Sequence, residues 1–112
     1  MRAEVLKGHL DGLLLATLEG GPQHGYAVIE ALRQRTGGSL DLPTGTVYPA
    51  LHRLERSDLI KSSWLEGSPR PRRVYRLTPA GRRALRESRA TWAEFSAAVS
   101  AVLDGTPWMP NA

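Results

Sequence analysis

Residues 44–65 read TGTVYPALHRLERSDLIKSSWL, and the spacing of their apolar side chains changes partway along. Val47, Leu51 and Leu54 recur at i, i+4 and i+7, which is the period of an amphipathic helix with a polar opposite face. Thr44 can cap the start of this helix with its hydroxyl group. The stretch therefore predicts a helix that begins near residue 44 and is followed by extended structure.

The extended part is typical of a β-hairpin. Residues 60–65 and 74–77 contain β-branched and aromatic side chains, and we expect a strand in each. The residues between them, EGSPRPRR at 66–73, hold two prolines and a glycine, which disfavour regular structure. The prediction is a hairpin whose tip carries several arginines.

Helices are expected on both sides of this stretch. The leucines on one face of a first helix, which ends at Gly20-Gly21-Pro22, are Leu6, Leu10, Leu13, Leu14 and Leu18. A second helix follows and ends at Gly37-Gly38. Thr78 is placed to cap a last helix that has Pro79 in its first position and runs to about Leu103.

This order of helix, helix, helix, hairpin and long helix is that of a winged helix-turn-helix domain. The expected fold class is mainly α with a small β-hairpin. We expect residues 1–78 to form the winged domain, including an N-terminal helix that supports a dimer. Residues 79–104 would form a C-terminal dimerisation helix, and residues 105–112 a flexible tail.

The composition supports one small domain. The chain has 112 residues, of which 41% are hydrophobic and 23% charged, so a disordered chain is not expected. It contains no cysteine, which excludes disulfides and thiolate metal sites. The longest apolar run, Leu13 to Ala16, is far too short to span a membrane, and we expect a cytoplasmic protein.

Basic residues are concentrated in the middle of the chain. Residues 53–89 hold 11 basic and 4 acidic side chains, whereas residues 1–52 hold 4 and 5, and residues 90–112 hold none and 2. Thirteen of the 15 basic residues are arginines, whose planar group suits phosphates and guanine edges. The block is typical of a surface that binds a polyanion, and the alternative is a solvated face without a ligand.

Several motifs make the sequence more specific. They are Gly25-Tyr26, GTVYPALHRLE at 45–55, Asp58-Leu59-Ile60, Trp64, RVYRLT at 73–78, and Gly81. From about residue 6 to residue 103 the chain resembles the PadR family of bacterial transcriptional regulators. The resemblance implies a homodimeric repressor that binds a pseudo-palindromic operator in double-stranded DNA and is released by a small molecule or another signal. The family usually has glycine where this chain has Asp58, and aspartate tolerates unusual turn backbone.

The expected DNA contacts come from the third helix and the hairpin. Thr46 and Arg53 suit base edges or phosphates, and Ala50 can touch a thymine methyl group. For Tyr48 two roles stay open, since its ring can pack against the second helix or its hydroxyl group can bind a phosphate. The full set of predicted DNA-binding residues is Thr44, Thr46, Tyr48, Pro49, His52, Arg53, Lys61, Arg70, Arg72 and Arg73. Four arginines at 82, 83, 86 and 89 are expected on the solvated face of the last helix.

The last helix carries an apolar stripe that its own small domain cannot cover completely. Leu85, Trp92 and Val99 recur every seven residues. The positions three residues after them hold Ser88, Phe95 and Val102, so the polar Ser88 interrupts the apolar stripe once. A partner chain is expected to cover it. The predicted dimer interface comprises Leu6, Leu10, Leu14, Leu85, Trp92, Phe95, Val99 and Val102. The resemblance gives Trp92, Phe95 and Val99 a second role, as the lining of a cavity that binds a planar aromatic effector.

Other kinds of function have little support in the sequence. The histidines at 9, 24 and 52 lack the spacing of metal ligands, and no catalytic motif accompanies the serine, histidine and aspartate residues. We therefore expect no metal site, no cofactor and no enzyme activity. When bound to DNA the protein is expected at the nucleoid. The alternative function is a winged-helix module that binds another protein instead of DNA.

Overall fold

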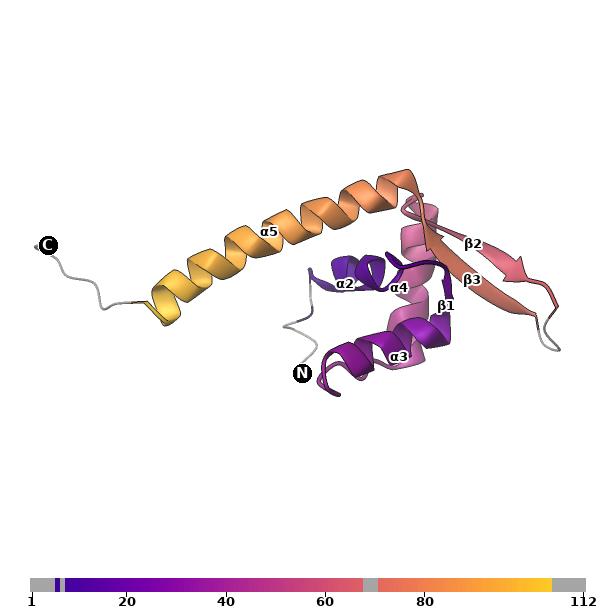
Figure 1. Cartoon of the computed structure of the whole chain (residues 1–112), viewed down its shortest axis with the longest axis horizontal. Coiled ribbons are helices and arrows are strands. Elements are labelled where there is room, and N and C mark those ends of the chain that lie inside the picture. The colour runs from indigo at the N-terminus through magenta and orange to yellow at the C-terminus, as the bar shows by residue number, and fades with distance from the viewer. Residues whose placement is uncertain (1–5, 7, 68–70, 106–112) are drawn as a thin grey trace, which may run out of the picture.

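The computed structural model describes residue 6, residues 8–67 and residues 71–105. The elements, labelled as in Figure 1, are α2 (Leu10–Thr17), β1 (Gln23–His24), α3 (Gly25–Arg35), α4 (Thr44–Arg56), β2 (Ile60–Leu65), β3 (Arg72–Leu77) and α5 (Pro79–Leu103). This succession confirms the winged helix-turn-helix fold expected from the sequence. Within the described ranges, no helix is both long and apolar enough to cross a membrane.

The hairpin and α5 extend in opposite directions from a body formed by α2, α3 and α4 (Figure 1). The sheet has a third strand that the sequence did not predict, in the order β1-β3-β2. Gln23 of β1 lies opposite Tyr75, and His24 lies opposite Val74. Because β1 has two residues, it is too short to show the alternation that identifies a strand. It fastens the start of α3 to the hairpin.

The core lies where the three body helices meet the base of the hairpin. Val47, Leu51 and Leu54 of α4 are at most 1% exposed, which confirms their predicted inward orientation. The other large side chains that are almost fully buried are Leu14, Leu15, Leu18, Val28, Ile60 and Tyr75. The apolar face of α4 therefore packs in the core of the domain, and its polar face remains available for other contacts.

The first helix differs from the prediction. The leucine spacing predicts one helix from Leu6 onward, but Gly8 has a φ of +87° and α2 begins only at Leu10. A left-handed residue interrupts the hydrogen bonds of a right-handed helix. The apolar spacing continues across the interruption, which is why periodicity alone did not reveal it.

The helix starts follow the sequence signals in one case and not in another. The Thr78 hydroxyl accepts a hydrogen bond from the Gly81 N–H at 3.0 Å, so Thr78 caps α5 as predicted. At α4 the capping position is occupied by Pro43, and Thr44 is the first residue of the helix. The prediction that the Thr44 hydroxyl caps α4 is therefore wrong, since no side chain forms a capping hydrogen bond there. Pro49 lies inside α4, as expected, where it leaves the Gly45 carbonyl without its usual N–H donor.

The hairpin, α4 and α5 meet in a tight corner. Asp58 has a φ of +60°, the left-handed backbone that glycine usually supplies at such a turn. Its carbonyl accepts a hydrogen bond of 2.6 Å from the Thr78 hydroxyl, and the Leu59 carbonyl accepts one of 3.1 Å from the Thr78 N–H. A Cβ at Gly81 would lie 1.9 Å from the Leu59 carbonyl oxygen. The corner therefore requires glycine at position 81.

Two further contacts hold α5 against the body. A Cβ at Gly12 of α2 would lie 3.0 Å from the Cβ of Ser88, so the small residues at both positions allow the helices to approach closely. Ser88 interrupts the apolar stripe of α5 because α2 crosses the helix at this point. Arg89 forms two hydrogen bonds, of 2.6 and 2.8 Å, with the Glu19 carboxylate, and these lower the pKa of Glu19.

Candidate nucleic-acid interface

The exposed face of α4 carries most of the side chains that the sequence assigned to DNA. Thr44, Thr46, Pro49, His52 and Arg53 are all exposed. Ala50 was predicted on the same face, but it is only 4% exposed and belongs to the core, so its predicted contact with a thymine methyl group is wrong. Ala50 precedes Leu51 and follows Val47 by three residues, which places it at the edge of the buried stripe.

Arg53 has an intramolecular partner that the sequence did not reveal. Its two terminal nitrogens each donate a hydrogen bond of 2.8 Å to the carboxylate of Asp11 in α2. The pairing raises the pKa of Arg53 above its ordinary value, and both side chains remain about half exposed. Because the guanidinium fork is already engaged by an anion, a DNA phosphate or base would have to compete with Asp11 for it.

Tyr48 packs against the start of α3, which is the first of its two predicted roles. A Cβ at Gly25 would lie 2.6 to 2.8 Å from three atoms of the Tyr48 side chain, namely two ring carbons and the hydroxyl oxygen. The ring is thus seated on the bare backbone of Gly25, and Tyr48 remains partly exposed.

Replacing Gly25 by alanine is expected to displace the Tyr48 ring and to lower the free energy of unfolding by about 1–2 kcal/mol, as overpacking does. Thermal or urea unfolding measures the loss. The same substitution in a Tyr48→Ala background should cost much less, because the ring that the new Cβ meets is gone. An equal cost in both backgrounds would show that Gly25 is needed for another reason.

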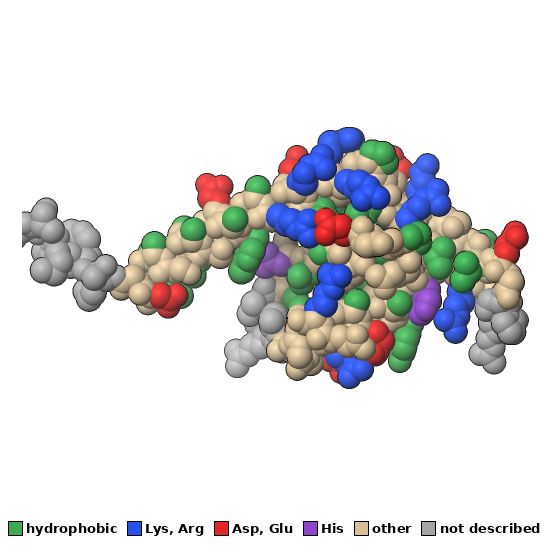
Figure 2. All heavy atoms as spheres, in the orientation of Figure 1, with side chains coloured by type: hydrophobic (Ala, Val, Ile, Leu, Met, Phe, Trp, Pro, Cys, Tyr) green, Lys and Arg blue, Asp and Glu red, His purple; other side chains and the backbone are tan. Residues whose placement is uncertain are grey.

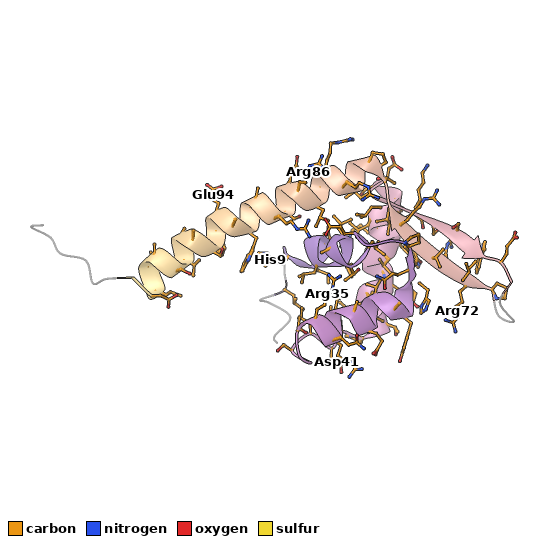
Figure 3. The ribbon with its side chains drawn as sticks, viewed as in Figure 1. His9, Arg35, Asp41, Arg72, Arg86 and Glu94 are labelled. Carbon is orange, nitrogen blue, oxygen red and sulfur yellow. The ribbon has the colours of Figure 1, made fainter. Side chains whose placement is uncertain are left out.

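The hairpin of β2 and β3, which is the wing of the fold, holds Arg72 and Arg73 in defined positions. The Arg73 Nε donates a hydrogen bond of 2.7 Å to the Ser62 hydroxyl, and its guanidinium carbon lies 5.7 Å from the centre of the Trp64 ring. Arg72 projects from the side of the hairpin that faces α3 (Figure 3), and its Nη1 lies 3.2 Å from the His24 Nε2. Lys61 is exposed and lies opposite Arg76. Arg70 lies outside the described residues.

The start of α3 joins α4 to the wing. The His24 Nδ1 accepts a hydrogen bond of 3.1 Å from the Ala27 N–H and so caps α3. Its other ring nitrogen lies beside Arg72 of β3, and the next residue, Gly25, supports Tyr48 of α4. Residues from three separate elements are therefore gathered around one helix N-terminus. This convergence was not visible in the sequence, because 48 residues separate His24 from Arg72.

The apolar stripe of α5 divides into a buried and an exposed part. Leu85 is 3% exposed, and Leu6 and Leu14 are 8% and 0% exposed, because the chain's own core covers them. These three residues are therefore not available to a partner, and their assignment to a dimer interface is corrected. Farther along α5, Trp92, Phe95 and Val102 are 55%, 51% and 83% exposed.

Trp92 and Phe95 form an aromatic cluster with His9. The rings of His9 and Trp92 meet edge to face with centroids 5.4 Å apart, and Phe95 lies 6.3 Å from Trp92. Leu10 and Val99 are partly buried. Green apolar side chains continue along the projecting part of α5 in Figure 2. The described residues of the chain therefore cover this part of the stripe only in part, and it remains open to a partner.

Solved structures with similar folds cover nearly the whole chain. A transcriptional regulator from Clostridium thermocellum matches with a TM-score of 0.83 at 27% identity, over 90% of this chain and 99% of the other. A PadR family transcriptional regulator from Eggerthella lenta matches with a TM-score of 0.79 at 34% identity, over 92% and 88%. Bacillus subtilis PadR in complex with operator DNA matches with a TM-score of 0.64 at 22% identity, over 71% and 46%.

The sequence itself matches a family model. Residues 14–87, from the middle of α2 to the first turns of α5, match the transcriptional regulator PadR-like family. The match spans the helix-turn-helix and the wing and leads into the helix that carries the apolar stripe. Proteins of this family regulate transcription and are not enzymes. The chain therefore belongs to the PadR-like family of transcriptional regulators.

Proposed function

We propose that this chain is a homodimeric repressor that binds a pseudo-palindromic operator in double-stranded DNA. The observation that carries the proposal is the gathering of α4, the start of α3 and the wing arginines described above. A helix with an exposed polar face beside an arginine-bearing hairpin suits a major groove and the neighbouring phosphates. The similar fold of Bacillus subtilis PadR, which was solved with operator DNA, supports the same use of these elements.

The proposed DNA-binding residues divide into those that contact base edges and those that contact phosphates. Thr46 and His52 would contact base edges from the exposed face of α4, and Thr44, Tyr48 and Pro49 lie near its start, where the backbone of the duplex would pass. Lys61, Arg70, Arg72 and Arg73 would supply phosphate contacts from the wing. Arg53 would join them only by exchanging Asp11 for DNA.

The exposed part of the α5 stripe supports the dimer. Trp92, Phe95, Val99 and Val102 lie on one face at heptad spacing, and a second copy of α5 can cover them. Two copies of α4 would then enter successive major grooves about 34 Å apart. A solvent-exposed tryptophan and phenylalanine are costly to leave uncovered on a long helix, and this cost favours association.

The same residues suit a planar aromatic effector. Trp92, Phe95 and Val99 offer ring faces and an aliphatic side chain where two helices would cross. Such a ligand would release DNA only if it bound more tightly to a dimer whose winged domains are set at a different angle. In this proposal the protein acts in the cytoplasm, at the nucleoid when bound to DNA.

The test begins with DNA sites selected from random sequence by the purified protein. Binding is then measured at several salt concentrations for the wild type and for a variant with Arg72→Ala and Arg73→Ala. The loss of two phosphate contacts should weaken binding to all sequences and reduce the slope of log affinity against log salt by about 1–2. A variant with Arg83→Ala and Arg86→Ala changes the charge equally on the outer side of α5, where Figure 3 places Arg86.

The outcomes separate the proposal from its alternative. Equal slopes for both double variants would remove the wing from the DNA-binding surface. Failure to select any sequence, with no salt-dependent binding, would favour the module that binds another protein. The spacing of the selected half-sites also reports the distance between the two copies of α4.

A further inference from the structure

We propose that Glu55 and Ser62 are positioning residues that hold the wing arginine Arg73 in the orientation it needs for DNA. The proposal rests on the proposed DNA-binding function, and specifically on a phosphate contact by Arg73. It assigns a role to two residues that the sequence did not place at the DNA interface, since Glu55 is acidic and Ser62 is a half-buried strand residue.

The first step of the chain joins α4 to the wing. One oxygen of the Glu55 carboxylate accepts a hydrogen bond of 2.9 Å from the Ser62 N–H. The same oxygen accepts a hydrogen bond from the Ser62 hydroxyl group. Because a carboxylate can only accept, the Ser62 hydrogen must point toward Glu55. This direction leaves the lone pairs of the Ser62 oxygen for another donor.

Arg73 is that donor. Its Nε donates to the Ser62 oxygen at 2.7 Å, from the neighbouring strand β3. The three groups thus form one directed chain in which Arg73 donates to Ser62 and Ser62 donates to Glu55. An anionic acceptor at one end and a cationic donor at the other strengthen both hydrogen bonds.

Trp64 holds the other side of the guanidinium group. Trp64 lies directly opposite Arg73 in the β2–β3 register, and the guanidinium carbon lies 5.7 Å from the centre of its ring. The Trp64 ring is 62% exposed, so a core role does not account for its position. A cation over an aromatic face loses freedom to swing away.

The terminal nitrogens of Arg73 are the groups that would donate hydrogen bonds to a phosphate. The described contacts use only the Nε and the face of the guanidinium group, and no described hydrogen bond engages its two terminal nitrogens. An arginine that is already oriented loses less rotamer entropy when it binds. The same chain fixes the wing to α4, so the phosphate contact and the groove contact keep a constant separation.

A double-mutant cycle tests the proposal. DNA affinity and its salt slope are measured for the wild type, Ser62→Ala, Arg73→Ala and the double variant, on a site selected by the wild-type protein. We expect Ser62→Ala to weaken binding about 3- to 10-fold and to reduce the salt slope. In the Arg73→Ala background, Ser62→Ala should have no further effect. Ser62→Thr, which keeps the hydroxyl group and suits a strand, should bind like the wild type.

Two controls separate the orientation of Arg73 from the stability of the hairpin. Ser63→Ala changes the neighbouring exposed serine, for which the described hydrogen bonds include no side-chain contact, and should leave affinity unchanged. Glu55→Ala removes the other end of the chain and should reproduce the Ser62→Ala effect on the salt slope. The melting temperature of each variant is recorded to verify that the domain remains folded at the assay temperature.

Each result has one meaning. If Arg73→Ala alone leaves DNA binding unchanged, the phosphate contact of Arg73 in the proposed function is wrong. If Arg73→Ala weakens binding but Ser62→Ala does not, or if the two losses simply add, the positioning role is wrong while the DNA-binding function stands. If Ser62→Thr binds DNA more weakly than the wild type, the positioning role is also wrong.

Discussion

A chain in which Gly81 is replaced by alanine is expected to unfold about 12–24 °C below the wild type. The new Cβ would lie 1.9 Å from the Leu59 carbonyl oxygen, which is a backbone atom and cannot rotate away. Relief requires α5 to move off the corner, and this breaks the hydrogen bonds of Thr78 to Asp58 and Leu59. Strain of this kind costs roughly 3 kcal/mol, and in a domain of this size each kcal/mol lowers the melting temperature by about 4–8 °C.

Gly45 provides the matched control for this substitution. No atom lies within 4 Å of a Cβ placed there, and the residue is in the first turn of α4. Gly45→Ala should therefore keep or slightly raise the melting temperature, because alanine favours helix more than glycine does. If Gly81→Ala melted like Gly45→Ala, the tight corner would not be a source of stability. Circular dichroism during heating is sufficient to compare the two.

The largest effect on function is expected from Trp92→Glu combined with Phe95→Glu. Both side chains are about half exposed in the single chain, so the substitutions leave the core intact. In the proposed dimer they would place four carboxylates in an apolar interface, and burying unpaired charges is costly. The protein should become monomeric. Because two linked heads bind far more tightly than one, operator affinity should fall by about 10²- to 10⁴-fold.

The charge-matched control for this experiment is Ala90→Glu combined with Ala97→Glu. Both alanines are exposed and lie on the side of α5 away from the stripe, two residues before Trp92 and two residues after Phe95. This variant should remain dimeric and bind DNA, with only a modest loss from added negative charge. Sedimentation velocity reports the oligomeric state of each protein. A Trp92, Phe95 double variant that stays dimeric would show that another surface joins the copies.

The sequence predicted elements best where local signals agree. In α5 the cap at Thr78, the proline after it and the apolar spacing all indicated the same helix, and the observed bounds are Pro79–Leu103. The positive φ of Asp58 agrees with the expectation that aspartate can occupy an unusual turn at this position. Local preference could not locate β1, whose two residues pair with a strand about 50 positions later.

The candidate site was harder to predict than the fold. Periodicity identifies an apolar face, but it does not say whether the same chain or a partner covers it, and Leu14 and Leu85 proved to be core. Residue type suggested that Arg53 meets DNA, yet its described partner is Asp11, 42 positions away in the sequence. The chain from Glu55 through Ser62 to Arg73 likewise depends on distances that only the folded structure supplies.

The corner at Gly81 also limits how the winged domain can move. Since the base of α5 cannot pivot there, the domain and the first turns of α5 must turn as one piece. From Ser88 to Leu103 the helix extends about 22 Å beyond its contact with α2. In the proposed dimer, a change of about 10° in the angle at which two such helices cross would displace the winged domains by roughly 4 Å relative to each other, and adjacent nucleotides are about 3.4 Å apart. A small change in how the two copies of α5 cross is thus enough to shift the spacing of the two winged domains by about one base pair along the duplex.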